Sequence, residues 1–322
     1  MNNTMLSVDV VNDRIHAGQR FSFTLQRTLR LPDDGKTYPL PPGLGPFPVL
    51  RVSDYKAAVP TSWLERGGFF VPLYQREALW LQFEAAWWKP NAIMIRAGGI
   101  NVVSGESQND QLSDSPQNYV VCPGQPWLDG INAGDGVIRQ FVATPLGRGD
   151  TIEEQLTGDH RYGGFQLSVF EPVPGKFPDE APPGGDIRFE SAFELAGSGM
   201  GIAAGGRMEQ KIYPDEHGLE TWDQETYAHV FINLVNSEQF LAITGREPPP
   251  SPISAHLYTN MGLPWFRLYD EQRGDVASPE SLTRVRSLRE RELDRGEVDD
   301  EEEILDIDPS QIISFKNKKS IE

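Results

Sequence analysis

"RFSFTLQRTLRL", residues 20–31, contains the pattern that decides the fold class of this chain. Phe21, Phe23 and Leu25 alternate with polar residues in this stretch. A period of two is typical of a β-strand that buries one face and exposes the other. We therefore predict a half-buried strand here.

The same signal recurs on the C-terminal side of this stretch. Leu79, Leu81 and Phe83 alternate with other residues, and further strand-like runs occur at 91–105, 117–122, 136–146, 163–173 and 228–235. The 322 residues include 31 glycines and 26 prolines, which interrupt the chain too often for long helices. We therefore predict a mainly β fold: a two-layer or sandwich-like β domain with few short helices over residues 1–275.

The chain changes character near its C-terminus. Ser278 and Pro279 are typical of a helix start, and an apolar stripe follows, so an amphipathic helix is predicted over residues 276–296. Residues 297–308 hold eight acids and no base, which predicts an acidic, disordered tail over 297–322. Within 1–275, residues 174–186 contain four prolines and three glycines and are the best candidate for an internal linker.

Charge and composition exclude several classes of protein. The net charge is −18 and no cluster of lysine and arginine occurs before residue 280, so nucleic-acid binding and attraction to an anionic membrane are not expected. The first residues lack a secretory signal, and no run approaches the ~20 apolar residues of a membrane span. Cys122 is the only cysteine and is flanked by apolar residues, which predicts a buried thiol and fits a soluble, cytoplasmic protein.

The stretch "LDGINAGDG" (128–136) resembles a ligand loop more than any other part of the chain. Asp129, Asn132 and Asp135 are candidate ligand or metal-binding residues. Their spacing of three does not match the alternating ligands of a calcium loop, and no lysine follows to complete a phosphate loop. The alternative is a structural corner between two strands, in which short polar side chains bond to nearby backbone groups. We favour the corner.

Gly199, Gly201 and Ala204 match the spacing of a dinucleotide-binding loop. That motif also requires a helix that begins at the glycines, and Pro214 follows too soon for a long one. We therefore expect a tight connection between strands and no cofactor.

Histidines provide no metal site by their spacing. The five are dispersed, and only "DEHG" (215–218) places acids beside one of them, His217. A general base there is one interpretation and a surface turn is the favoured one. No metal is expected.

The acidic tail contains a short apolar segment, Ile304, Leu305 and Ile307, directly after five acids. It resembles segments that add a strand to ubiquitin-like domains, with the acids facing a basic groove. A protein partner through this tail is therefore one hypothesis, and a solvated tail without a partner is the other.

Three stretches, 71–84, 127–143 and 243–271, together resemble an uncharacterised family of bacterial and fungal hypothetical proteins. The likeness spans most of residues 20–271 and leaves out the acidic tail. It implies that these three stretches are the distinctive parts of the family, and it implies no catalytic residues.

The sequence contains no recognisable nucleophile motif, metal cluster or cofactor loop. We therefore expect a soluble, non-enzymatic binding or assembly protein. The alternative is an enzyme, such as a metal-assisted hydrolase, that uses the acids of the 129–135 loop.

Overall fold

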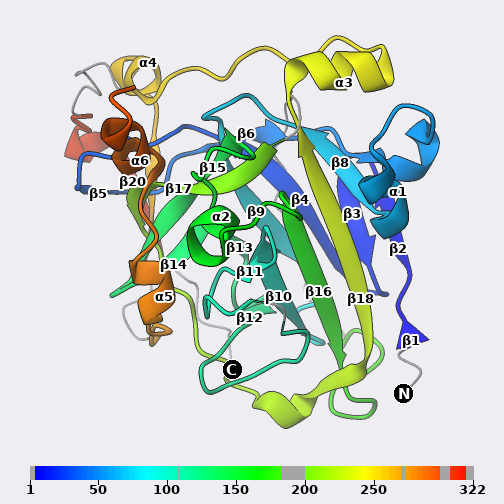
Figure 1. Cartoon of the computed structure of the whole chain (residues 1–322). Helices are drawn as coiled ribbons and strands as arrows, with labels where there is room; N and C mark the ends of the chain where they lie inside the picture. Colours follow the sequence, from blue (N-terminus) through cyan, green and yellow to red (C-terminus); the bar gives the residue numbers. More distant parts are fainter. Residues whose placement is uncertain (1–3, 108, 183–199, 270–272, 298–304, 317–322) are drawn as a thin grey trace.

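The computed structural model describes residues 4–107, 109–182, 200–269, 273–297 and 305–316 (Figure 1). Strands account for 38% of the described residues and helices for 17%, so the fold is mainly β with few short helices, which confirms the fold class predicted above. Among the described residues, no helix is long and apolar enough to cross a membrane.

Eighteen of the described strands belong to one sheet, which consists of two series of neighbours. In the first series each main strand pairs antiparallel with the next. Its main strands are β2 (Val8–Val11), β3 (Arg14–Ala17), β4 (Phe21–Thr28), β9 (Ala78–Glu84), β15 (Val137–Pro145) and β17 (Met200–Glu209). The short strands β5 (Thr37–Tyr38), β6 (Gly43–Pro46), β13 (Trp127–Leu128) and β14 (Gly130–Gly134) pair with them.

The second series has β16 and β18 at its centre. Its strands are β1 (Thr4–Met5), β7 (Leu50–Arg51), β8 (Phe69–Pro72), β10 (Asn91–Ala97), β11 (Ile100–Asn101), β12 (Val120–Cys122), β16 (Phe165–Pro172) and β18 (Trp222–Val235). The two series meet at one residue pair, Met200 of β17 with Leu234 of β18. The strands on either side of the 174–186 segment, β16 and β17, thus belong to the same sheet.

Both series bury side chains in one apolar core. Phe23, Leu81 and Phe141 come from the first series, and Leu167 and Val230 come from the second. The rings of Phe141 and Phe165 meet edge to face with their centroids 5.1 Å apart. The two series therefore pack against each other as layers of a sandwich do. Cys122 is buried in the same core, as predicted, and burial raises the pKa of its thiol.

Strand β4 differs from the prediction because both of its faces are buried. All eight of its residues are buried, including Gln26 and Arg27. Gln26 Nε2 donates to Gln82 Oε1 (3.0 Å), and Thr28 Oγ1 donates to the Pro42 carbonyl (2.8 Å). The alternating polar residues thus bond to neighbours inside the protein, where the sequence pattern alone predicts contact with solvent.

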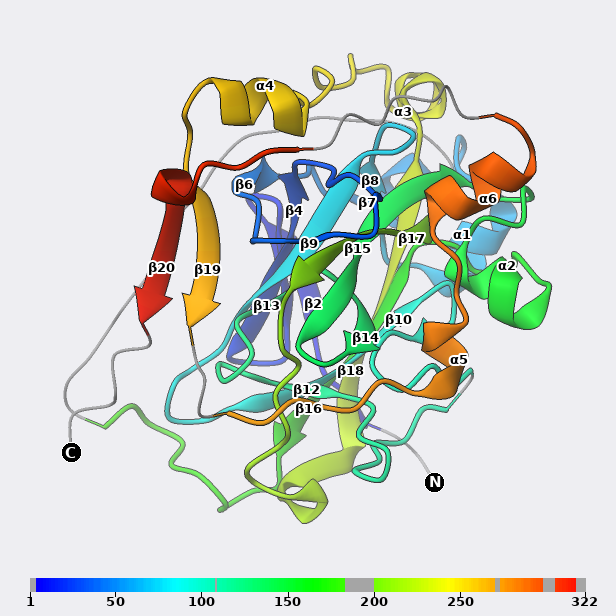
Figure 2. The same cartoon turned by 90° about the vertical axis from the view of Figure 1, so that its left-hand side faces the viewer.

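The helices are short and lie on the outside of the sheet (Figures 1 and 2). They are α1 (Thr61–Arg66), α2 (Ile152–Thr157), α3 (Ser237–Thr244), α4 (Ala255–Asn260), α5 (Glu280–Thr283) and α6 (Leu288–Asp294), with 3-10 turns η1 (Val52–Tyr55), η2 (Leu219–Thr221) and η3 (Pro309–Gln311).

The structure divides the single helix predicted over 276–296 into α5 and α6. The intervening backbone bonds to the sheet: Arg139 Nη1 donates to the Val285 carbonyl (2.7 Å), and Ser287 forms a bridge to Ala204. Ser287 then caps α6 through a capping box with Glu290. Tertiary hydrogen bonds therefore interrupt the apolar stripe, although Leu282 and Leu288 are buried as the stripe implies.

Part of the predicted acidic tail is folded. Leu305 is 4% exposed and belongs to the main core, and Ile307 is partly buried against it. β20 (Ile312–Lys316) then pairs in parallel with β19 (Trp265–Tyr269), as Figure 2 shows. Ile304, the third residue of the proposed partner segment, lies outside the described residues. Because Leu305 is buried in the chain's own core, it is not available to a partner in this structure.

Candidate functional site

The "LDGINAGDG" stretch forms the hairpin between β14 and β15. Asn132 is 1% exposed, its Nδ2 donates to the Val103 and Val276 carbonyls, and its Oδ1 accepts from the Gly134 amide (3.0 Å). Gly134, Asp135 and Gly136 all have positive φ, at 81°, 54° and 71°. This geometry is that of a tight corner held by an asparagine.

The two aspartates of this stretch lie apart, at opposite ends of the five-residue strand β14. At ~3.3 Å per residue this separates them by roughly 15–20 Å. Asp129 is 3% exposed and Asp135 is exposed at the turn. Within the described part of the chain, no group of three or more His, Cys, Asp or Glu side chains is placed to hold a metal ion.

Asp129 is bonded to a neutral partner inside the protein. Gln210 Nε2 donates to Asp129 Oδ1 (2.6 Å), and the Asp129 amide donates to Gln210 Oε1 (3.0 Å). Burial raises the pKa of the Asp129 carboxyl to about 7, although the hydrogen bond from Gln210 opposes the change. The bonding links β14 to the end of β17 and leaves no accessible carboxylate.

The other candidates from the sequence lie in structural positions. Gly201 and Ala204 are inside strand β17, and neither a helix nor a tight connection begins there, while Gly199 lies outside the described residues. His217 is exposed in a turn in which its amide donates to Asp215 Oδ1 (2.8 Å).

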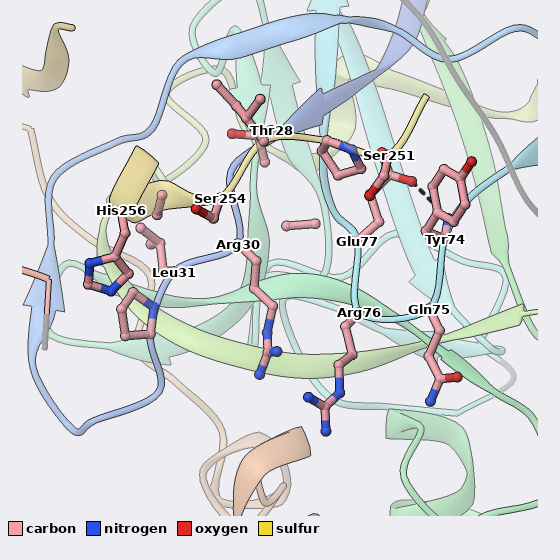
Figure 3. A pocket seen from close by; sticks show the side chains of 15 residues that line it. Thr28, Arg30, Leu31, Tyr74, Gln75, Arg76, Glu77, Ser251, Ser254 and His256 are labelled. Atoms are coloured by element: carbon pink, nitrogen blue, oxygen red, sulfur yellow. Dashed lines mark hydrogen bonds between the residues drawn. The ribbon is translucent and has the colours of Figure 1, made fainter. Parts of the chain in front are cut away.

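A pocket of about 450 Å³ opens where the end of β4, the turn before β9 and the segment before α4 meet (Figure 3). It is lined by Thr28 and residues 30–32, by residues 74–78, and by residues 251–256. Its volume lies in the ~300–1,000 Å³ range usual for ligand pockets.

A buried ion pair between Arg27 and Glu77 ties the three walls of the pocket together. Arg27 Nε donates to Glu77 Oε1 (2.6 Å), and Arg27 Nη2 donates to the Pro250 carbonyl (3.0 Å). The Tyr74 amide donates to Glu77 Oε2 (2.8 Å), and the Tyr74 hydroxyl donates to the Pro249 carbonyl (2.7 Å). The pair therefore positions the turn and the 249–256 segment against β4.

Glu77 has little freedom to act on a ligand. Its side chain is 0% exposed and both carboxylate oxygens accept the hydrogen bonds given above. Burial raises the pKa of the Glu77 carboxyl to about 7, although Arg27 and the Tyr74 amide favour the charged form. We conclude that Glu77 is a structural residue beneath the pocket.

Two arginines bring positive charge to the lining of the pocket. In Figure 3 the side chains of Arg30 and Arg76 run next to each other toward the same side of the pocket. Arg76 has a positive φ of 67°, and its amide donates to the Ala143 carbonyl (2.7 Å), which holds this unfavourable backbone in place. Its side chain is 43% exposed and pairs with Glu292 of α6, with Nη2 2.6 Å from Oε1.

A serine–histidine pair elsewhere in the sheet is less suited to chemistry. Ser168 of β16 and His229 of β18 are cross-strand neighbours, with Oγ 3.0 Å from Nδ1. His229 lines a smaller pocket of about 290 Å³, but Ser168 does not line it and is 0% exposed. A substrate in that pocket would not reach the serine oxygen.

The sequence pattern does not identify the residues of the larger pocket, because they come from three distant segments. One signal was present in "YQREALW" (74–80), which places Arg76 and Glu77 inside an otherwise apolar region. Charged residues in such a setting indicate a buried pair. The partner of Glu77 is Arg27, which is 50 residues away in the sequence. Only the pairing of β4 with β9 shows that these two residues meet.

No family model, no curated protein and no solved structure matches this chain.

Proposed function

We propose that this chain is a non-enzymatic binding protein whose larger pocket takes small molecules with a carboxylate or phosphate group. The observation that carries the proposal is the charge of the pocket, where Arg30 and Arg76 lie next to each other in a chain of net charge −18 (Figure 3). Guanidinium groups bind carboxylates and phosphates through pairs of parallel N–H donors. A local excess of arginine therefore favours an anionic ligand.

The acid in the pocket lining does not cancel this charge. Among the lining residues Glu77 is the only acid, and Arg27 and the Tyr74 amide already engage both of its oxygens. Below pH 7 its raised pKa also favours the neutral form. The carboxylate of Glu292 pairs with Arg76 from α6.

Binding is favoured over catalysis because two of the three candidate acids, Glu77 and Asp129, are buried. A general base must come within hydrogen-bond reach of its substrate, and the Glu77 side chain is 0% exposed. The alternative enzyme would use the 129–135 loop, but Asp129 is buried and Asp135 lies at the far end of β14. The pocket also receives residues from two of the stretches that the sequence marked as distinctive, 71–84 and 243–271.

The test is a ligand-observed NMR titration with propanoate and with methyl phosphate, and with trimethylammonium as the cationic control. Two or three charged hydrogen bonds should give a dissociation constant on the order of 1 mM for the anions. The variant Arg30→Gln/Arg76→Gln should lose this binding. The matched control is Arg161→Gln, since the Arg161 side chain is 73% exposed and outside the pocket.

A gain-of-binding variant sharpens the test. Glu292→Gln removes the carboxylate that neutralises Arg76, so propanoate should bind about threefold more tightly. Unchanged propanoate binding in Arg30→Gln/Arg76→Gln, or equal binding of trimethylammonium, would refute the proposal.

A further inference from the structure

An exposed apolar stripe begins at the pocket and continues along α4. Ile253 lines the pocket and is 40% exposed, Leu257 is 50% exposed and Met261 is 61% exposed. Leu257 and Met261 are four residues apart and so lie on the same side of α4. Ile253 stands four residues before Leu257, just ahead of the capping Ser254. We call these three residues the apolar stripe.

Exposed large apolar side chains are scattered over the rest of the molecule but are grouped at the stripe. Ten large apolar side chains are exposed in the described part of the chain, and three of them fall within residues 253–261. Single exposed apolar residues are ordinary, whereas a group at the mouth of a pocket is typical of a ligand-contact surface.

We infer that the ligand is an amphiphile, with an anionic head at Arg30 and Arg76 and an unbranched apolar tail along the stripe. This inference rests on the proposed function. The pocket and the stripe are continuous because Ile253 belongs to both. The two arginines supply the charge complementarity to the head.

The length of the stripe indicates the length of the tail. Ile253 and Met261 are eight positions apart: the two steps before α4 span up to ~3.3 Å each and the six helical steps ~1.5 Å each, so the stripe is about 16 Å long at most. With carbon–carbon bonds of ~1.5 Å set in a zigzag, each bond advances the chain by ~1.25 Å, so a saturated tail of about ten to thirteen carbons covers the stripe.

The size of the stripe favours a ligand tail over a protein partner. Three partly exposed side chains offer far less area than the ~1,200–2,000 Å² buried in a stable protein interface. They suffice to cover one side of a single alkyl chain.

The experiment measures dissociation constants for propanoate, hexanoate and decanoate, all below the concentrations at which micelles form. Affinity should increase about twofold to fourfold per methylene, the upper value being that for complete burial. Leu257→Ser/Met261→Ser should weaken decanoate binding at least fivefold and leave propanoate unchanged. Val11→Ser is the control, because Val11 is 53% exposed on β2.

Each outcome separates the inference from the proposed function. Propanoate binding without any dependence on chain length would overturn the amphiphile and retain the anion pocket. Decanoate binding that survives Arg30→Gln/Arg76→Gln would refute both the anionic head and the proposed function. If wild type sediments as a dimer and Leu257→Ser/Met261→Ser as a monomer, the stripe is a contact between copies and the inference is wrong.

Discussion

The hairpin of β14 and β15 and the pocket beside β4 each contain a buried acid, and the two acids have different neighbours. Asp129 is bonded to the neutral Gln210, and Glu77 is paired with Arg27. In both cases burial raises the pKa of the carboxyl to about 7. Asp129 links the hairpin to the end of β17 through Gln210. Glu77 and Arg27 hold the walls of the pocket together.

The comparison teaches that a stretch which resembles a ligand loop can form a tight corner held by its own asparagine. Asn132 bonds to the nearby Gly134 amide and to the Val276 carbonyl, and Asp129 bonds to the distant Gln210. The pocket is formed by residues from three segments that are distant in the sequence. Four predictions sharpen this contrast.

The largest effect is expected at the pocket. Arg27→Met leaves Glu77 buried without its cation and removes the bond to the Pro250 carbonyl. The free energy of unfolding at pH 8 should fall by about 3–5 kcal/mol, measured by urea denaturation. The control is Arg284→Met, whose exposed pair with Glu280 should contribute less than about 0.5 kcal/mol. Equal effects of the two substitutions would show that the buried pair does not hold the pocket.

The second prediction concerns pH and the hairpin acid. Unfolded Asp129 releases its proton near pH 3.8, whereas the folded protein retains it to about pH 7. The unfolded state thus binds fewer protons between these values, so this carboxyl makes the unfolding free energy fall as pH rises, and the fall ends near pH 7.

Asp129→Asn should remove this component, which is up to about 4 kcal/mol. Urea denaturation at pH 4, 5.5 and 8 measures it as a wild-type-minus-variant difference. A difference that does not vary with pH would contradict the raised pKa.

The third prediction tests the corner backbone. Gly136 has a φ of 71°, and a Cβ there would meet Lys211 only at an ordinary 3.5 Å. Gly136→Val should therefore lower the unfolding free energy by about 1–3 kcal/mol through backbone strain alone. Gly136→Asn is the matched control and should cost less than the valine, because asparagine tolerates positive φ. A valine variant as stable as wild type would contradict this conformation.

The smallest effect is expected at Asp135. Its side chain is exposed at the turn, so Asp135→Asn should change the unfolding free energy by less than about 0.5 kcal/mol. Calorimetric titration of Ca²⁺, Mg²⁺ and Mn²⁺ should give the same result for wild type and variant. If wild type binds one of these ions tightly and the variant does not, the hairpin is a metal site and the prediction is wrong.

Much of the fold was predictable from particular stretches. The alternation at Phe21, Phe23 and Leu25 predicted β4, and the corner at residues 128–136 followed from its glycines and asparagine. Gly245 ends α3 in the left-handed conformation, as its position after an apolar helix indicates. These features depend on residues close together in the sequence.

The remaining features depend on contacts between distant residues. The burial of both faces of β4, the division of 276–296 into two helices and the burial of Leu305 all follow from tertiary contacts that override local preference.

The sequence by itself determined the strand periodicity, the turns and the acidic charge, because each is a property of neighbouring residues and of composition. Only the tertiary structure decided which charges meet. Arg27 and Glu77 are 50 residues apart, and the pairing of β4 with β9 places one against the other. Because buried charges are paired, Arg27 bonds to Glu77 and to the Pro250 carbonyl, and these bonds connect the segments that line the pocket.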